Sequence, residues 1–439
     1  MQAPGFTVRS HRVGPAFDLL AGYGGVFMER SGSGVAGTGV AFRVGFNLEG
    51  RGAAEMTSVV DAFLSGVRRA DDDPAAPAPI ALSGIRRADD DPAAPAPIAF
   101  GSIPFERSRT VTLTIPARTI RRDRGEAWAL DVSPAWEPPL SAEGRRVLGS
   151  FEPSPAFGAM QLRTRPSSDA YVRGVADAVA RIRAGELRKV VLARTVEVAA
   201  GRRLDPAQLL RRLRAVDPDC YAFAVDTGAR APSRDRVLVG ASPELLVSRF
   251  GREVRSTPLA GSAPRFGDPD RDRESGEGLL ASPKEREEHA LVVEAVEVSL
   301  DPFCDELDRD PEPILLPTAN VWHLSTRFRG TLKEPAADAL TLAAALHPTP
   351  AVCGVPRDAA RALIRELEPF ERDGYGGPVG WVDANGDGEW AIALRCAELR
   401  GDVARLFAGA GIVADSEPER ELDETERKFR AFLDSLRWG

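Results

Sequence analysis

The last third of the chain holds a run of β-prone segments separated by turn residues, and this run constrains the fold most. Residues 376–413 read GGPVGWVDANGDGEWAIALRCAELRGDVARLFAGAGIV, in which apolar stretches alternate with Gly, Asp and Asn. Such short connections join antiparallel strands, because parallel strands need a crossover of a dozen or more residues. We therefore expect consecutive hairpins. The DANGDG segment (383–388) resembles the start of a calcium loop, but Leu394 replaces the required final Glu, so we interpret it as a hairpin turn.

Helical patterns are interleaved with the predicted strands. Apolar residues recur at helical spacing after Ser168 or Asp169, either of which can cap a helix that Gly185 ends. We expect a buried strand at 189–198, a long helix from about Pro283, and a last helix from near Pro418 almost to the C-terminus. Because the elements lack regular βαβ alternation, the sequence predicts an α+β fold.

The region before residue 150 shows strands and loops. Residues 24–44 have glycines between β-prone runs, as in a meander. A direct repeat follows, with SGVRRADDDPAAPAPIAL at 65–82 and SGIRRADDDPAAPAPIAF at 83–100. Because a solenoid needs more than two copies, we interpret 65–100 as a surface loop extended by duplication, without chemistry. We divide the chain into a strand-rich region at 1–150, within the same fold, and a catalytic region at 151–439.

Composition excludes several classes of protein. The 439 residues carry a formal net charge of −8, and no basic run suggests a nucleic-acid partner. The four cysteines are scattered, which argues against a zinc site or disulfides and favours a reducing cytoplasm. Neither a leader segment nor an apolar run long enough to span a membrane is recognisable, so we expect a cytoplasmic enzyme without membrane association.

Two acidic helix starts are the most informative candidates for a site. Glu285 and Glu288 are three residues apart and share one helix face, and Glu421 and Glu424 repeat this spacing in the last helix. A single such pair usually belongs to a solvated surface. Two pairs, each heading an apolar face, instead indicate buried carboxylates that must be paired, protonated or bound to metal. Four oxygen ligands without Cys or His suit Mg²⁺.

Three further features have both a functional and an ordinary interpretation. Glu244 follows a predicted sharp turn at Gly240 and Pro243, and would either be presented at the strand end or simply decorate a loop. Lys189 opens an apolar strand, where its amine either snorkels to solvent or works in a pocket. Residues 408–413, AGAGIV, form a glycine loop that permits close backbone approach to an anion, although they lack the GxGxxG pattern.

Together these segments resemble the chorismate-binding enzymes, the family of isochorismate, salicylate, anthranilate and aminodeoxychorismate synthases. The resemblance extends from about Ser168 to the C-terminus. It rests on motifs that occur in the family's order: KVVLAR, GASPELL, PLAGSA, SPKEREEH, VWHLST, LHPTPAVCG, GGPVGWVD, IALRCAEL, AGAGIV and ERELDETERK. It implies large, mostly antiparallel β-sheets packed face to face and flanked by helices, with chorismate as the substrate.

The resemblance also implies roles for individual residues. Glu288 and Glu424 match direct Mg²⁺ ligands, whereas Glu285 and Glu421 match acids that hold the metal through water. Lys428 matches a cation near the ring carboxylate of chorismate, and Arg395 matches one that binds the enolpyruvyl carboxylate. The remaining positions match substrate contacts or pocket residues: Gly261, Ser262, His323, Ala351, Tyr375, Gly409 and Gly411.

Within the family, a few positions favour isochorismate synthase. Lys189 matches the general base that activates water for attack at ring C2, and Glu244 the acid that protonates the departing C4 hydroxyl. Ala260 stands where aminodeoxychorismate synthases have a nucleophilic lysine, and its methyl group cannot form that adduct. Because Lys189 argues against ammonia chemistry, no glutamine amidotransferase partner is expected.

Two alternatives remain from the sequence. Salicylate synthase, which also eliminates pyruvate, more often has threonines at Ser262 and Ala351. A catalytically silent chorismate-binding subunit is disfavoured because the acid, base and metal ligands are all present. The sequence leaves open whether the product feeds menaquinone, a catechol siderophore or salicylate. A monomer is the default expectation.

Overall fold

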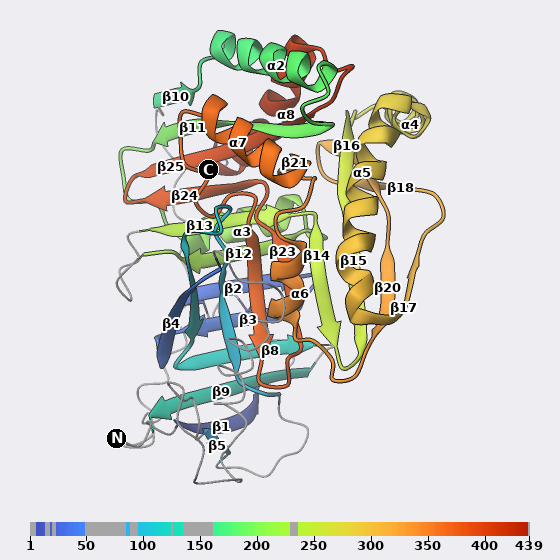
Figure 1. Ribbon diagram of the computed structural model, residues 1–439. Helices are drawn as coiled ribbons and strands as arrows, with labels where there is room; N and C mark the ends of the chain where they lie inside the picture. Colours follow the sequence, from blue (N-terminus) through green and yellow to red (C-terminus); the bar gives the residue numbers. More distant parts are fainter. Residues whose placement is uncertain are drawn as a thin grey trace.

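The computed structural model describes residues 6–13, 18–19, 23–48, 85–87, 95–123, 126–134, 161–228 and 236–437. Within these ranges the chain forms two large β-sheets, a small third sheet and seven α-helices (Figure 1). The predicted α+β class is therefore confirmed.

The larger sheet runs through the whole height of the molecule in Figure 1. Its described strands lie in the order β10 (Gln161–Arg165), β11 (Lys189–Ala199), β25 (Val403–Ile412), β24 (Cys396–Arg400), β13 (Val237–Ser242), β12 (Tyr221–Asp226), β2 (Gly25–Arg30), β3 (Ser33–Thr38), β8 (Arg118–Asp123), β9 (Glu126–Pro134), β1 (Phe6–Val13) and β5 (Ile85–Arg87), and β21 (Gly354–Val355) also pairs with β11. All paired strands here are antiparallel except β1 and β5.

The other two sheets are antiparallel throughout their described pairs. The second sheet has the order β17 (Cys304–Arg309), β20 (Phe328–Leu332), β15 (Glu253–Thr257), β14 (Leu245–Phe250), β23 (Gly388–Ile392), β22 (Pro378–Asp383), β6 (Ile98–Ser102), β7 (Thr110–Ile115) and β4 (Phe42–Asn47). The small sheet has the order β16 (Leu259–Pro264), β19 (Val321–Ser325) and β18 (Ile314–Pro317).

The two large sheets share apolar core. Phe223 of β12 lies in one cluster with Phe100 of β6 and Trp381 of β22, and all three side chains are buried. Because this cluster contains residues of both sheets, the inner face of each sheet shields that of the other from water. This is the face-to-face arrangement expected from the family resemblance.

The N-terminal strands pair with strands from the rest of the chain. β2 pairs with β12 and β6 pairs with β22. The predicted meander at 24–44 is only partly correct: β2 and β3 form a hairpin, but β4 belongs to the second sheet, beside β7. Long-range pairing decides this, and local glycine spacing does not encode it. Of the duplicated segment 65–100, only 85–87 and 95–100 fall within the described residues. There the predicted surface loop is wrong for 85–87, which form β5, and for 98–100, which are buried in β6 because they pair with β22.

Helices flank the sheets. α2 (Ser168–Arg183) packs against α8 (Pro418–Arg437), which lies along β25, and α3 (Pro206–Val216) packs on β12 and β13. α6 (Ala339–Leu346) covers β14, β22 and β23, while α7 (Arg357–Leu367) packs on β11. α4 (Pro269–Ala281) and α5 (Pro283–Leu300) lie against β16, at the right of Figure 1, and a 3₁₀ turn (Asp301–Phe303) follows α5.

The sequence predicted three of the seven described helices, α2, α5 and α8, and the hairpins that β22 forms with β23 and β24 forms with β25. The helix predicted after Ser168 is α2, but its cap is Ser167, whose Oγ accepts from the Ala170 N–H at 3.3 Å. The DANGDG segment is a turn between β22 and β23, where Asp383 Oδ1 accepts from the N–H groups of Asn385 and Asp387. Among the described helices, none is long and apolar enough to cross a membrane.

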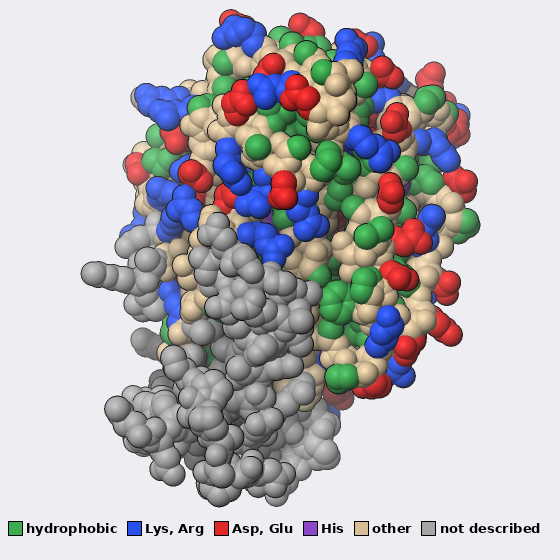
Figure 2. Space-filling view, viewed as in Figure 1, with side chains coloured by type: hydrophobic (Ala, Val, Ile, Leu, Met, Phe, Trp, Pro, Cys, Tyr) green, Lys and Arg blue, Asp and Glu red, His purple; other side chains and the backbone are tan. Residues whose placement is uncertain are grey.

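Charged side chains of both signs are intermixed on the face shown in Figure 2. Acidic and basic groups alternate over its upper and right-hand parts, where Figure 1 places α2, α4 and α5.

Candidate active site

A cavity lies where β13, β14, β16, β25, α5 and α8 meet. Its empty volume, open mouth included, is about 730 Å³, a size typical of small-molecule sites. Twelve of the fifteen predicted site residues line it: Glu244, Gly261, Ser262, Glu288, His323, Ala351, Tyr375, Arg395, Gly409, Gly411, Glu424 and Lys428. Lys189, Glu285 and Glu421 do not line the cavity. Lys189 contacts the lining residue Glu288 and Glu285 contacts the lining residue Ser262, whereas Glu421 contacts Lys284.

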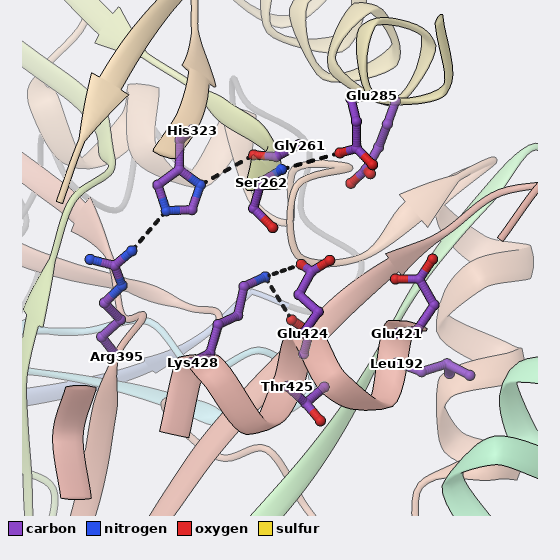
Figure 3. Close-up of polar contacts among 12 residues, drawn as sticks. Leu192, Gly261, Ser262, Glu285, His323, Arg395, Glu421, Glu424, Thr425 and Lys428 are labelled. Carbon is purple, nitrogen blue, oxygen red and sulfur yellow. Dashed lines mark hydrogen bonds and ion pairs between the residues drawn. The ribbon is translucent and has the colours of Figure 1, made fainter. Parts of the chain in front are cut away.

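The four predicted acids come from the first two turns of two helices, α5 and α8. Ser282 caps α5, accepting from the Glu285 N–H at 3.4 Å, and a proline stands at the start of both α5 and α8. Because carboxylates near a helix N-terminus are stabilised by its dipole, both starts favour this placement. Figure 3 shows Glu285 from one helix and Glu421 and Glu424 from the other, directed toward the same region.

Each of these acids has a partner. Glu288 Oε1 lies 3.0 Å from Lys189 Nζ, Glu424 Oε1 accepts from Lys428 Nζ at 2.6 Å, and Glu421 Oε1 accepts from Lys284 Nζ at 2.7 Å. Glu285 Oε2 accepts from the backbone N–H of Ser262 at 3.1 Å (Figure 3).

Repulsion among the acids alters their ionisation. Burial, and then the charges of Glu288 and Glu424, raise the pKa of Glu285 to about 7. Burial and the charge of Glu424 raise the pKa of Glu421, against the opposing effect of Lys284. Burial would also raise the pKa of Glu424, but Lys428, Lys284 and a hydrogen bond with Ser262 together outweigh it, so the pKa of Glu424 is lowered. The cluster is therefore short of positive charge.

The donor set suits a hard divalent cation, since all four groups offer oxygen and four carboxyl groups face only three lysines among the described residues. Within the part of the chain that the structure describes, no three His, Cys, Asp or Glu side chains are already assembled at metal-binding spacing. Three of the four acids instead hold a lysine each.

Lys189 is fully buried at the start of β11. Of the two interpretations from sequence, snorkelling to solvent is wrong, because the amine is directed at Glu288 inside the protein. It lies one layer behind the cavity wall, of which Glu288 forms part.

Glu244 lies between β13 and β14, and of the two interpretations from sequence, simple decoration of a loop is wrong. Its side chain is only 2% exposed and faces the cavity. Burial raises the pKa of Glu244 to about 8, although a hydrogen bond from the Leu259 N–H and the charges of Lys189 and Lys428 oppose the shift. The carboxyl group is therefore protonated at neutral pH and can donate a proton.

The opposite wall of the cavity is cationic. Arg395 Nη2 donates to His323 Nε2 at 2.7 Å, and His323 Nδ1 lies 3.2 Å from the carbonyl oxygen of Gly261 (Figure 3). Burial, Arg395 and Lys428 lower the pKa of His323 well below its usual value, so the ring is neutral and carries its proton on Nδ1. Tyr375 stacks on Phe407 with ring centroids 5.0 Å apart.

The glycines do not form the expected loops. Gly409 and Gly411 lie within strand β25, paired with Ala193 and Val191, so the predicted AGAGIV loop is wrong. A Cβ on Gly411 would lie 2.0 Å from Glu288 Oε1, which explains the need for glycine. Gly261 sits at a bulge in β16 with φ +76°, and not in a turn. This bulge aims the Ser262 N–H at Glu285.

Sequence reasoning missed several neighbours of the cavity. Lys284 contacts the acids, and Asp217 lies 3.7 Å from Arg395. Arg372 and Glu368 form a buried ion pair. Arg372 also donates to the carbonyl oxygens of Val191 and Val352, and Glu368 accepts from the Ala193 N–H. The position of Lys284 next to Glu285 in the sequence could have identified it as a neighbour of the acids. Asp217, Glu368 and Arg372 carried no such signal, because only the fold brings them near the cavity.

This combination of two packed antiparallel sheets, paired acids at two helix starts and a cationic wall defines a class of enzyme for small anionic substrates. A profile described as "Chorismate binding enzyme" matches residues 143–437. The chain therefore belongs to the chorismate-binding enzyme family.

Individual relatives are similar over most of the chain. The isochorismate synthase DhbC of Bacillus subtilis is 41% identical over 337 residues, which are 76% of this chain and 80% of that protein. The crystal structure of the putative 2,3-dihydroxybenzoate-specific isochorismate synthase DhbC from Bacillus anthracis has a TM-score of 0.78 at 36% identity, covering 95% of this chain and 98% of that one. The menaquinone-specific isochorismate synthase MenF from Escherichia coli has a TM-score of 0.77 at 26% identity, covering 99% and 95%.

Proposed function

We propose that this protein is an isochorismate synthase, an isomerase that converts chorismate to isochorismate. The three relatives described above carry that name. The observation that carries the proposal is a protonated acid, Glu244, facing the same cavity as the cations Arg395 and Lys428. A site with this arrangement can hold a dicarboxylate and deliver a proton to a leaving hydroxyl.

The reaction would use a base and an acid within one cavity. Water attacks ring C2 while Lys189 accepts its proton, and the C4–O bond breaks as Glu244 donates a proton to the departing hydroxyl. One water enters and one leaves, so substrate and product are isomers. Lys189 contacts Glu288, and Glu288 lines the cavity. The carboxylate of Glu288 therefore stands between the amine and the cavity, and the amine has to pass it to reach the attacking water.

The substrate's two carboxylates would be held at separate places. Lys428, close to Glu424 and the Gly409 carbonyl, would lie near the ring carboxylate. Arg395, oriented by His323, would bind the enolpyruvyl carboxylate. Since Lys428 and Arg395 both line the cavity, the ring between them would lie within reach of Glu244.

We further propose that Mg²⁺ is the cofactor. Glu288 and Glu424 would bind it directly, and Glu285 and Glu421 through water, consistent with their oxygen donors and mutual repulsion. When bound, Mg²⁺ would supply positive charge against the ring carboxylate and orient it.

The proposal includes neither a reaction with ammonia nor the glutamine amidotransferase subunit that would supply it. Ala260 lines the cavity with a methyl group that cannot form a covalent adduct. We propose a cytoplasmic monomer with chorismate as its substrate and without an amidotransferase, nucleic acid or membrane as a partner; light scattering after size-exclusion chromatography tests the monomer.

The test is to incubate purified protein with Mg²⁺ and chorismate and to follow products by chromatography. We expect isochorismate to accumulate without pyruvate. Pyruvate released in equal amounts, together with fluorescent salicylate, would instead identify a salicylate synthase.

Two variants test the assigned roles. Lys189→Ala should lose turnover, and full turnover would exclude Lys189 as the base. Glu288→Ala should lose Mg²⁺-dependent activity, and an undiminished Mg²⁺ response would exclude it as a ligand. Lys333→Ala is a matched control, because that lysine is exposed and its ammonium group donates to the Pro302 carbonyl, away from the proposed site.

A further inference from the structure

Lys284 joins the two acidic helix starts. It is the second residue of α5, and its Nζ lies 2.7 Å from Glu421 Oε1 of α8 and 3.6 Å from Glu285 Oε1 of its own helix. Its side chain is 27% exposed, whereas that of Glu421 is 2% exposed. A single ammonium group therefore bridges two acids from different helices, with a route to solvent on its own side.

The composition of the chain makes this lysine unusual. Of the 57 Lys and Arg residues only four are lysines, namely Lys189, Lys284, Lys333 and Lys428. Three of these four contact at least one of the four acids Glu285, Glu288, Glu421 and Glu424. In a chain that otherwise uses arginine, lysine is concentrated at this site. Lysine has a compact charge on a flexible stem, whereas the planar guanidinium of arginine binds carboxylates bidentately.

The other two of these lysines have proposed roles toward the substrate, but Lys284 does not line the cavity. Its contacts are with Glu421 and Glu285, the two acids proposed to hold the metal through water. Buried carboxylates without a counterion are strongly unfavourable. A cation on a flexible stem satisfies them when no metal is bound, and withdraws toward solvent when a divalent cation supplies the charge.

We propose that the Lys284 ammonium is an internal counterion of the metal-free acidic cluster, and that it competes with the divalent cation and so sets its affinity. The inference rests on the proposed magnesium site. The lysine keeps the cluster folded without metal, at the expense of weaker metal binding.

The experiment is a calorimetric titration of Mg²⁺ into the substrate-free protein, with thermal unfolding in EDTA and in Mg²⁺. Lys284→Met keeps the apolar stem and removes the charge. We expect it to bind Mg²⁺ about tenfold more tightly, as removal of one nearby charge from a partly buried site implies. The melting temperature of this variant in EDTA should be lower than that of the wild type. Addition of Mg²⁺ should raise its melting temperature by more than it raises that of the wild type.

Three variants serve as comparisons. Lys284→Arg retains the charge and should not bind Mg²⁺ more tightly than the wild type. Lys333→Met removes the same charge from a surface site and should match the wild type. Lys284→Gln, which can still donate to Glu421, should reproduce the tighter binding and replaces Lys284→Met if that variant does not fold.

The outcomes separate the two proposals. Equal or weaker Mg²⁺ binding in both uncharged variants would overturn the role of Lys284 and leave the metal site standing. A wild-type protein that binds no Mg²⁺ would overturn both the metal site and the lysine's role.

Discussion

Gly411→Ala is the substitution whose effect the structure predicts most directly. The new Cβ would lie 2.0 Å from Glu288 Oε1 and 2.7 Å from its carboxylate carbon. Ordinary contact begins at 3.4 Å, so the carboxylate has to move by about 1.4 Å (3.4 minus 2.0). Gly411 lies in strand β25 outside the left-handed region, so its backbone accepts alanine.

Displacement of the Glu288 carboxylate should impair function and leave the fold intact. Glu288 would leave both Lys189, now 3.0 Å away, and its proposed place at the metal. Misplacement of a reacting group by about 1 Å can reduce the rate by about 100-fold, which at 1.36 kcal/mol per tenfold is about 2.7 kcal/mol. We therefore expect kcat/KM to fall by about 100-fold and Mg²⁺ affinity to fall with it.

The assay is chorismate consumption at varied Mg²⁺, with the melting temperature measured in parallel. Gly409→Ala, two residues away in the same strand, is a graded comparison, because its Cβ would meet the Tyr375 hydroxyl at 3.0 Å and should disturb activity less. Gly174→Ala, with no atom within 4 Å, should behave as the wild type. Wild-type kcat/KM and Mg²⁺ affinity in Gly411→Ala would refute the reasoning.

Three further predictions follow. Because the pKa of Glu244 is raised to about 8 and the acid must be protonated, kcat/KM should fall about tenfold per pH unit above that value; a flat profile to pH 9.5 would contradict this. Glu368→Gln leaves the buried guanidinium of Arg372 without its ion-pair partner and should reduce the free energy of unfolding by about 3 kcal/mol, which a urea titration with an unchanged midpoint would disprove. EDTA should abolish turnover and Mg²⁺ restore it, so activity that persists in EDTA would argue against a metal.

Local sequence pattern was sufficient for the two helices that carry the acids, for α2 and for one hairpin. The apolar spacing after Ser168, the prolines at 283 and 418 and the turn at DANGDG gave correct helices and a correct hairpin, because periodicity and capping act within a few residues. Twelve of the site residues that were predicted from the ordered motifs line one cavity. Their catalytic roles stay predictions.

Tertiary structure decided what depends on distant partners. AGAGIV reads as a glycine loop, but residues 190–194 pair with residues 408–412 and make this segment part of a strand. β4 leaves the apparent meander because its partner, β7, lies far along the chain.

The ionisation of the site is also a property of the fold. A glutamate's pKa depends on burial and on neighbouring charges, which neither the residue nor its neighbours in sequence specify. The sequence determined which acids, lysines and glycines the chain possesses and on which helices and strands most of them lie. Lys428 lies one helical turn after Glu424, so that contact is local. Only the fold buried Glu244 and placed Lys189 against Glu288 and Lys284 against Glu421, because these partners are far apart in sequence.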